Sequence, residues 1–214
     1  MPLTALVLGF MPFGPYRYNP TQDIAERLHK SAMFTGDLRI IGKALPVSYK
    51  RAPAQAIELI EEYHPQIILG MGLASRKRGI TIEIRGNNRK TSPYRDIDGE
   101  YYYGDGHPID RNGKPFYCTT ADEKQIIHRI NKNGIAALLS YDAERFVCNA
   151  LIYGVAKYIA ETDREVQFSY MHTPWTDAYL KLVKIEPGKE VIPAGHLRIA
   201  AETALACMYQ EVAV

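Results

Sequence analysis

Cysteine thiols are reactive side chains, and of the three cysteines in this sequence Cys148 lies at the position that best suits catalysis. It follows a strand-to-helix turn over residues 140–144 and lies in the first turn of the helix expected there. The N-terminus of a helix stabilises a thiolate, and its free N–H groups can bind an oxyanion. Position alone leaves two roles open, a nucleophile or a small core residue, because free cysteines are usually buried. Cys118 and Cys207 lie in apolar segments and are expected in the core.

A cysteine nucleophile needs a base, and the base needs a group that orients it. His172 ends an apolar run over residues 166–172 and precedes Thr173 and Pro174, whereas the other five histidines lie in polar segments. Glu83 is the acid in a strand-like stretch over residues 80–84. The residues alone also allow a structural histidine and an exposed strand carboxylate. The sequence therefore predicts a triad only if the fold brings Cys148, His172 and Glu83 together.

Apolar runs alternate with amphipathic stretches along the chain. Strands are expected over residues 4–10, 38–45, 66–71, 79–85, 136–140 and 166–172, and helices over 22–29, 52–63, 122–131, 145–159 and 195–211. Thr21 is the expected cap of the first helix. This alternation predicts a single-domain α/β fold over residues 1–214, a three-layer α/β/α sandwich with a mostly parallel twisted sheet and helices on both faces. Sites in such sheets form at the carboxyl ends of strands, where Phe10, Gly72 and His172 are expected.

Residues 86–115 differ from the rest of the chain. They are rich in Asn, Asp, Gly, Tyr and Arg and show almost no apolar period. We expect a long surface excursion with a hairpin at Asp105-Gly106 that serves as a lid or a subunit contact. The run Tyr101–Tyr103 suits an interface, since aromatic residues are enriched there. A solvent-exposed loop is an equally good interpretation of this run.

The composition is that of an ordinary soluble globular protein. The 214 residues are 46% apolar and 23% charged, and 26 basic against 24 acidic residues leave a net charge of +2. This balance argues against a nucleic-acid or anionic-membrane partner. The apolar start is too short to span a bilayer and lacks a basic segment before it, so it is interpreted as a strand. Three separate cysteines indicate neither a disulfide framework nor a zinc site, and we expect a reducing, cytoplasmic location.

Several segments resemble, in the same order, those of the pyroglutamyl peptidase I family, also called pyrrolidone-carboxylate peptidases. The resemblance extends from Val7 to about Trp175. It is carried by residues 9–14 with Asn19-Pro20, by 45–47 and 72–74, by Ile82-Glu83 with Asn88, by 146–149, and by His172 with Pro174. The matching segments for the cysteine, the histidine and the glutamate are together quite specific.

The resemblance implies a cysteine peptidase that removes an N-terminal pyroglutamyl residue through an acyl-enzyme. Cys148 would be the nucleophile, His172 its base, and Glu83 the group that orients the histidine. No metal or cofactor is implied, and a homo-oligomer, a dimer or tetramer, is expected. The flat lactam of the substrate would be bound by residues that the resemblance assigns to its pocket: Phe10 and Phe13 as aromatic walls, Leu73 and Val147 through their backbones, and Asn19 nearby.

Some positions depart from the family pattern and suggest a divergent member. Glu144 and Arg145 replace a small-residue turn before Cys148, and residues 76–78, Arg-Lys-Arg, replace a Gly-Arg turn. Further departures are Met11, Ile84, Thr173 and Trp175. Two alternatives therefore stay open. One is a related cysteine amidase acting on another small or cyclic acyl group, and the other is a catalytically silent protein of the same fold, in which Cys148 would be no more reactive than the other cysteines.

Overall fold

The computed structural model describes residues 2–29, 37–104, 107–180 and 189–213. Its centre is a six-stranded sheet in the order β2-β1-β3-β8-β4-β7. The strands are β1 (Leu3–Phe10), β2 (Leu38–Leu45), β3 (Ile67–Leu73), β4 (Ile80–Glu83), β7 (Ala137–Ser140) and β8 (Gln167–Thr173). Neighbouring strands are parallel except β8 and β4, which pair antiparallel. The α/β fold with a mostly parallel sheet is therefore confirmed.

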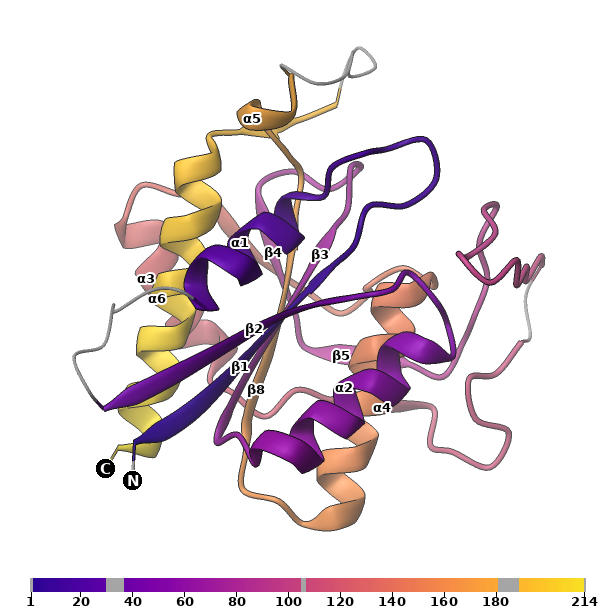
Figure 1. Cartoon of the computed structure of the whole chain (residues 1–214), viewed down its shortest axis with the longest axis horizontal. Helices are drawn as coiled ribbons and strands as arrows, with labels where there is room; N and C mark the ends of the chain where they lie inside the picture. Colours follow the sequence, from indigo (N-terminus) through magenta and orange to yellow (C-terminus); the bar gives the residue numbers. More distant parts are fainter. Residues whose placement is uncertain (1, 30–36, 105–106, 181–188, 214) are drawn as a thin grey trace.

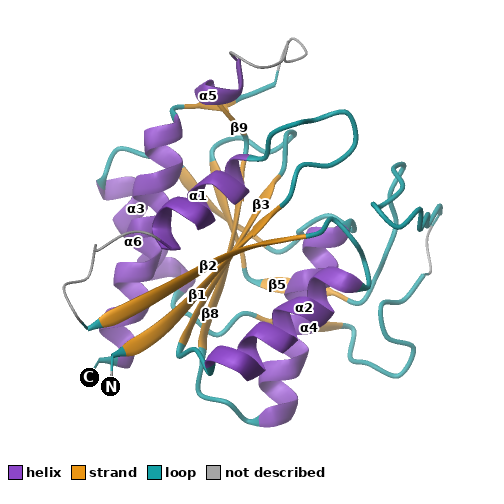
Figure 2. Ribbon diagram, viewed as in Figure 1, coloured by secondary structure: helices purple, strands orange, loops and turns teal. Residues whose placement is uncertain are grey.

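Helices cover both faces of the sheet (Figures 1 and 2). One face carries α1 (Pro20–His29), α3 (Glu123–Lys132) and α6 (Ala194–Val212), and the other carries α2 (Arg51–Tyr63) and α4 (Val147–Thr162). The side chains of β1 alternate between these layers: Ala5 and Val7 pack toward α1 and α6, and Leu6 and Leu8 toward α2 and α4. Because both faces are buried, the strand is apolar over residues 5–8 instead of alternating.

Five further elements are short, and four of them have no counterpart in the sequence prediction; the exception is the strand around Cys118, whose segment is strand-like in sequence. They are β5 (Arg85–Asn87), β6 (Phe116–Cys118), β9 (Trp175–Thr176), α5 (Asp177–Leu180) and β10 (Val191–Ile192). Segments of two to four residues contain too few side chains to show a period. β5 and β6 pair antiparallel and join the two ends of the predicted excursion. The hairpin expected at residues 105–106 lies outside the described residues.

Two local predictions were wrong. The first helix begins at Pro20, and Asn19 rather than Thr21 acts as its cap, because Thr21 N donates to Asn19 Oδ1 (3.1 Å). Thr21 instead accepts a hydrogen bond from Phe10 N through its hydroxyl (3.0 Å), which ties the helix to the end of β1. Cys118 is exposed rather than buried, since it lies in the short strand β6 whose neighbour Tyr117 faces the core.

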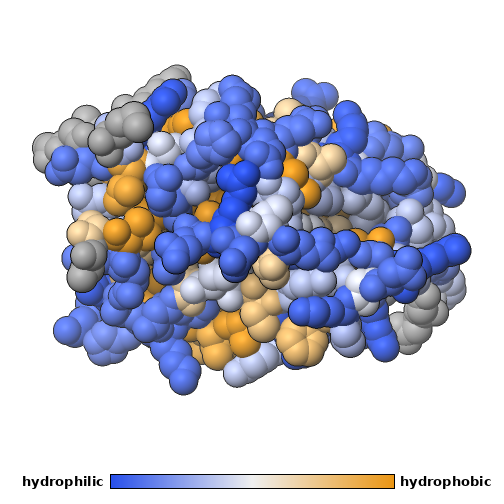
Figure 3. Space-filling model, turned by 90° about the horizontal axis from the view of Figure 1, so that it is seen from below, coloured by the Kyte–Doolittle hydropathy of each residue, from blue (hydrophilic) through white to orange (hydrophobic). Residues whose placement is uncertain are grey.

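The surface seen from below is mostly hydrophilic, and its apolar side chains lie in separate patches (Figure 3). Within the described ranges, no helix has both the length and the apolar character needed to cross a membrane. Several large side chains of the predicted excursion are exposed, above all Tyr103 at 75% and Tyr94 at 60%.

Candidate active site

Glu83 and His172 meet because β4 runs antiparallel to β8. The register pairs Glu83 with Tyr170 and Thr81 with His172, so Glu83 and His172 are diagonal neighbours on one face of the sheet. His172 Nδ1 donates to Glu83 Oε1 at 2.8 Å. The two side chains are 2% and 0% exposed. This buried contact fixes the imidazole and leaves Nε2 as its available nitrogen.

Cys148 reaches the same place from α4, across Gly72 of β3. Gly72 pairs with His172, and a Cβ on Gly72 would lie 2.7 Å from Cys148 Sγ and 3.2 Å from His172 Cδ2. The hydroxyl of Tyr170 would also collide with that Cβ. The missing side chain at Gly72 therefore leaves the room in which the thiol, the imidazole and the phenol converge. Cys148 itself is half-buried.

The charges of these groups depend on one another. Burial alone lowers the pKa of His172, but the charge of Cys148, a hydrogen bond to it and the contact with Glu83 outweigh burial and raise this pKa to about 9. Burial raises the pKa of Glu83, yet its hydrogen bonds and the His172 charge lower the pKa below its ordinary value. The site therefore favours an ionised Glu83, and it favours the imidazolium form of His172 when the sulfur of Cys148 carries a negative charge.

The start of α4 supplies backbone N–H groups next to the sulfur. The helix begins at Val147, two residues later than predicted, and no side chain caps it. Its first hydrogen bond runs from Ala150 N to Phe146 O (3.3 Å), so the N–H groups of Val147 and Cys148 precede the helical ladder. Phe146 precedes the helix in an extended conformation, and Glu144 in the turn before it adopts a left-handed conformation with φ of 60°. N–H groups at such a position suit an oxyanion.

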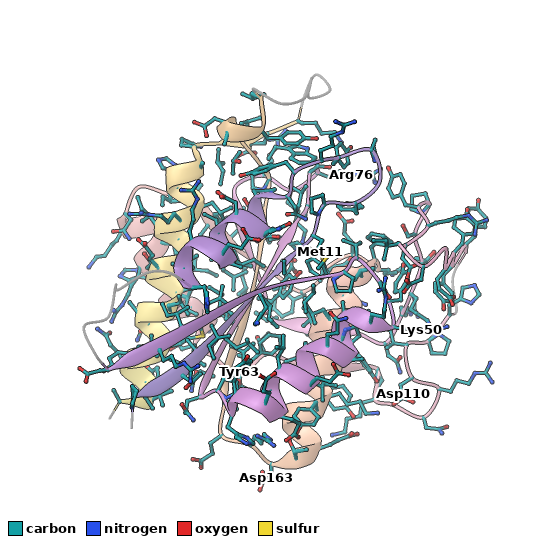
Figure 4. The ribbon with its side chains drawn as sticks, viewed as in Figure 1. Met11, Lys50, Tyr63, Arg76, Asp110 and Asp163 are labelled. Atoms are coloured by element: carbon teal, nitrogen blue, oxygen red, sulfur yellow. The ribbon has the colours of Figure 1, made fainter. Side chains whose placement is uncertain are left out.

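A cleft of about 1010 Å³ opens near the start of α4 and is lined by Phe13, Leu73 and Phe146 among others. Leu73 follows Gly72, and Phe146 lies two residues before Cys148, so the cleft lies next to the segments that carry the site, although Cys148 is not one of its lining residues. Its charged lining consists of Arg76, Arg95, Arg145, Lys189, Asp142 and Glu144. Met11 and Arg76 lie at this end of the sheet, whereas Tyr63 and Asp163 lie at the other end (Figure 4). The walls are therefore partly aromatic and partly basic.

The five predicted pocket residues occupy different places. Phe13 and Leu73 line the cleft, whereas Val147 is fully buried and Phe10 is 3% exposed at the end of β1. The side chain of Asn19 is engaged within the protein: its Nδ2 donates to Met11 O (3.2 Å), and its Oδ1 accepts from Thr21. Asn19 therefore shapes the loop between β1 and α1.

Two residues of this region were missed by the sequence analysis. Tyr170 lies in an apolar strand, where its phenol is indistinguishable from a core aromatic. Lys77 lies in a run of three basic residues that is typical of a solvated turn, but its Nζ donates to Glu83 Oε1 at 2.6 Å. No sequence signal separated Lys77 from its neighbours Arg76 and Arg78. Trp175, one of the departures from the family pattern, is buried and stacks on Tyr179 (4.0 Å between ring centroids).

Acidic, histidine and cysteine side chains do not gather into a metal-binding group of three or more within the described ranges. The chemistry that the described groups can perform is nucleophilic attack by a thiolate, with proton transfer through His172.

Comparisons with known proteins show which family the whole chain is similar to. The family model described as pyroglutamyl peptidase matches residues 3–205. A pyrrolidone-carboxylate peptidase of Bacillus cereus (strain G9842) is 31% identical over 172 residues, which are 80% of this chain and 78% of that protein. The crystal structure of pyroglutamyl peptidase I from Bacillus amyloliquefaciens has a TM-score of 0.87 at 26% identity and covers 96% of this chain and 97% of its own. Pyrrolidone carboxyl peptidase from Thermococcus litoralis has a TM-score of 0.88 at 27% identity, with 99% and 96% covered.

Proposed function

This chain belongs to the pyroglutamyl peptidase family and is a cysteine-type peptidase, and from this premise we propose that it hydrolyses the amide bond after an N-terminal pyroglutamyl residue. Cys148 is the nucleophile, His172 the general base and acid, and Glu83 the residue that orients the histidine. The proposal rests on the way Cys148 and His172 meet over Gly72, where Nδ1 of the imidazole donates a hydrogen bond to Glu83.

In the first step His172 takes the thiol proton, and the Cys148 thiolate attacks the pyroglutamyl carbonyl. The C–S bond forms as the carbonyl electrons move onto oxygen, where the N–H groups at the start of α4 stabilise the negative charge. His172 then gives its proton to the leaving amine as the C–N bond breaks. Water, deprotonated by His172, cleaves the thioester and frees pyroglutamate and Cys148.

Glu83 acts through His172 and not on the substrate. Its carboxylate holds the imidazole by Nδ1, so that Nε2 faces the sulfur, and it stabilises the imidazolium formed in the first step. The buried setting strengthens this effect, because the contact of 2.8 Å is shielded from water.

The lactam of the substrate is a small flat ring with one amide, which suits an aromatic-walled end of the cleft. We assign Phe13 to one wall and Phe10 to the floor beneath it, since Phe13 lines the cleft and Phe10 is buried at the end of β1. Leu73 and Val147 contribute backbone groups, and Asn19 fixes the loop that carries Phe13.

The test is release of a fluorescent amine from a pyroglutamyl amide, with a prolyl amide and the variant Cys148→Ala run beside it. We expect turnover of the pyroglutamyl compound only, and none in the variant. Equal turnover of the prolyl compound would refute the lactam pocket, and full activity of Cys148→Ala would refute the nucleophile.

A related cysteine amidase is the second candidate, because Glu144 and Arg145 both line the cleft beside Cys148. It would show no pyroglutamyl turnover, yet rapid alkylation of Cys148. That measurement needs a Cys118→Ser background, since Cys118 is exposed and would react as well. A silent protein would show neither activity nor a reactive Cys148.

We also infer a homo-oligomer, a dimer or tetramer, and a cytoplasmic location. The exposed aromatics Tyr94 and Tyr103 support the contact between copies, and three unpaired thiols support the reducing compartment. Light scattering on the wild type and on Tyr103→Ser tests the contact. A wild-type monomer at micromolar concentration would refute it.

A further inference from the structure

Lys77 holds the orienting acid of the proposed triad. Its Nζ lies 2.6 Å from Glu83 Oε1, the same oxygen that accepts from His172 Nδ1. Its other contacts are Asp142 O at 2.8 Å and Ser140 Oγ at 3.0 Å. The ammonium group thus donates to three acceptors, and the Lys77 side chain is only 17% exposed. We propose that Lys77 is a positioning residue that keeps Glu83 ionised and aimed at His172; the proposal rests on the triad assigned above.

The surroundings of Glu83 explain why a cation is needed there. The side chain is fully buried, and Oε2 has no hydrogen-bond partner among the described residues. A carboxylate in such a place takes up a proton unless charges or donors stabilise it. The titratable groups that face it are His172 and Tyr170 from β8, Lys77 from the loop before β4, and, beyond the imidazole, Cys148 from α4. Of these, Lys77 is the one whose ammonium group lies in direct contact with the Glu83 carboxylate from outside the proposed triad.

The state of Glu83 determines the reactivity of Cys148. An ionised Glu83 stabilises the imidazolium, and the imidazolium stabilises the thiolate. A protonated Glu83 is neutral and no longer stabilises the imidazolium, so the ion pair of His172 and Cys148 gives way to the neutral pair. Lys77 therefore keeps the reactive ion pair populated at acidic pH, where Glu83 would otherwise take up a proton.

Lys77 also connects the acid to the turn that leads into α4. Ser140 ends β7, and Asp142 lies in the turn before Cys148, so a single ammonium group joins the ends of β4 and β7 to this turn. If Lys77 served only to hold the turn in place, its contacts with Ser140 and Asp142 would account for its whole effect. The pH dependence of Cys148 separates the two roles, because loosening of the turn lowers reactivity at every pH, whereas protonation of Glu83 acts at acidic pH.

The experiment measures the rate of Cys148 alkylation by iodoacetamide between pH 4 and pH 9 in a Cys118→Ser background. The variants are Lys77→Met, Lys77→Arg and, as a matched control, Arg78→Met, which removes an exposed neighbouring cation outside the cleft. The acid limb is the part of the rate–pH profile in which the alkylation rate rises with pH. We expect the acid limb of Lys77→Met to move to higher pH by about one unit or more, which is the size of the effect of a close cation on a carboxyl pKa. Lys77→Arg and Arg78→Met should keep the wild-type limb.

Several outcomes would overturn the proposal. The first is that the acid limb of Lys77→Met stays at the wild-type pH or moves to lower pH. The second is that Lys77→Arg shifts the acid limb as far as Lys77→Met does. If Lys77→Met fails to fold, as judged by circular dichroism, Lys77→Gln replaces it, because the amide keeps a donor without the charge and should show the same upward shift. Alkylation requires no substrate, so failure of the pyroglutamyl assay would leave this result readable and would refute only the proposed function.

Discussion

The Cys148 sulfur lies 2.7 Å from the point where a Cβ of Gly72 would stand. Gly72→Ala should therefore displace the thiol and abolish most of the activity, with a loss of about 1–3 kcal/mol in the free energy of unfolding from overpacking. Amide hydrolysis and urea unfolding measure the two effects. Gly195→Ala is the control, because a Cβ there meets no atom within 4 Å. Wild-type activity in Gly72→Ala would contradict the described placement of Cys148.

Replacement of the three proposed triad residues should give graded losses. Cys148→Ala should remove hydrolysis without changing the thermal midpoint by more than a few degrees, and His172→Ala should cost several orders of magnitude in kcat/KM. Glu83→Gln should cost less, roughly 10²- to 10⁴-fold, because Glu83 orients and does not react. Steady-state kinetics at fixed pH distinguishes them. The assigned roles are wrong if Glu83→Gln is worse than Cys148→Ala.

Glu123 should make stability depend on pH. Its buried carboxyl accepts a hydrogen bond from Ser169 (2.7 Å), and burial raises its pKa to about 8, above the value of about 4.3 expected in the unfolded chain. A carboxyl of this kind stabilises the fold below its unfolded pKa, and that stabilisation is lost as the pH rises through about 8.

Glu123→Gln should flatten the decline in the free energy of unfolding between about pH 4 and pH 8, the window set by the two pKa values. Urea titrations at three pH values measure the slope. The exposed Glu165→Gln is the control and should follow the wild type. Parallel slopes for Glu123→Gln and the wild type would show that Glu123 is ionised when buried.

Glu144 adopts φ of 60° in the turn before α4, where a side chain is strained and glycine is not. Glu144→Gly should raise the free energy of unfolding by up to about 1 kcal/mol. Glu144→Ala keeps a Cβ and should give no such gain, which makes it the matched control. Equal effects of the two substitutions on the urea midpoint would locate the change in the lost carboxylate instead of the backbone.

The cleft has four basic and two acidic side chains in its lining. Pyroglutamyl peptides with an acidic second residue should therefore be cleaved with a kcat/KM several-fold above that of peptides with a basic one, and the ratio should shrink with added salt. Arg76→Gln should reduce the ratio, whereas Arg78→Gln, outside the cleft, should not. A preference for basic peptides would exclude this role of the lining.

Much of the fold could be predicted from local patterns. β1 and β8 are mostly apolar runs, and the helices show the period of a buried face, because the polarity of each side chain reflects whether it faces the core or the solvent. Cys148 stood out because the turn before it and the apolar helix after it are both local signals. The separate matching segments around Cys148, His172 and Glu83 then identified the family.

The tertiary structure alone decided which distant residues meet. Glu83 and His172 are 89 positions apart, and their contact depends on β4 running antiparallel to β8 with one particular register. Lys77 and Tyr170 carried no signal, since a lysine in a basic turn and a tyrosine in an apolar strand each have an ordinary interpretation. Strand direction and register are set by the free energy of the whole packed sheet, which no short stretch of sequence contains.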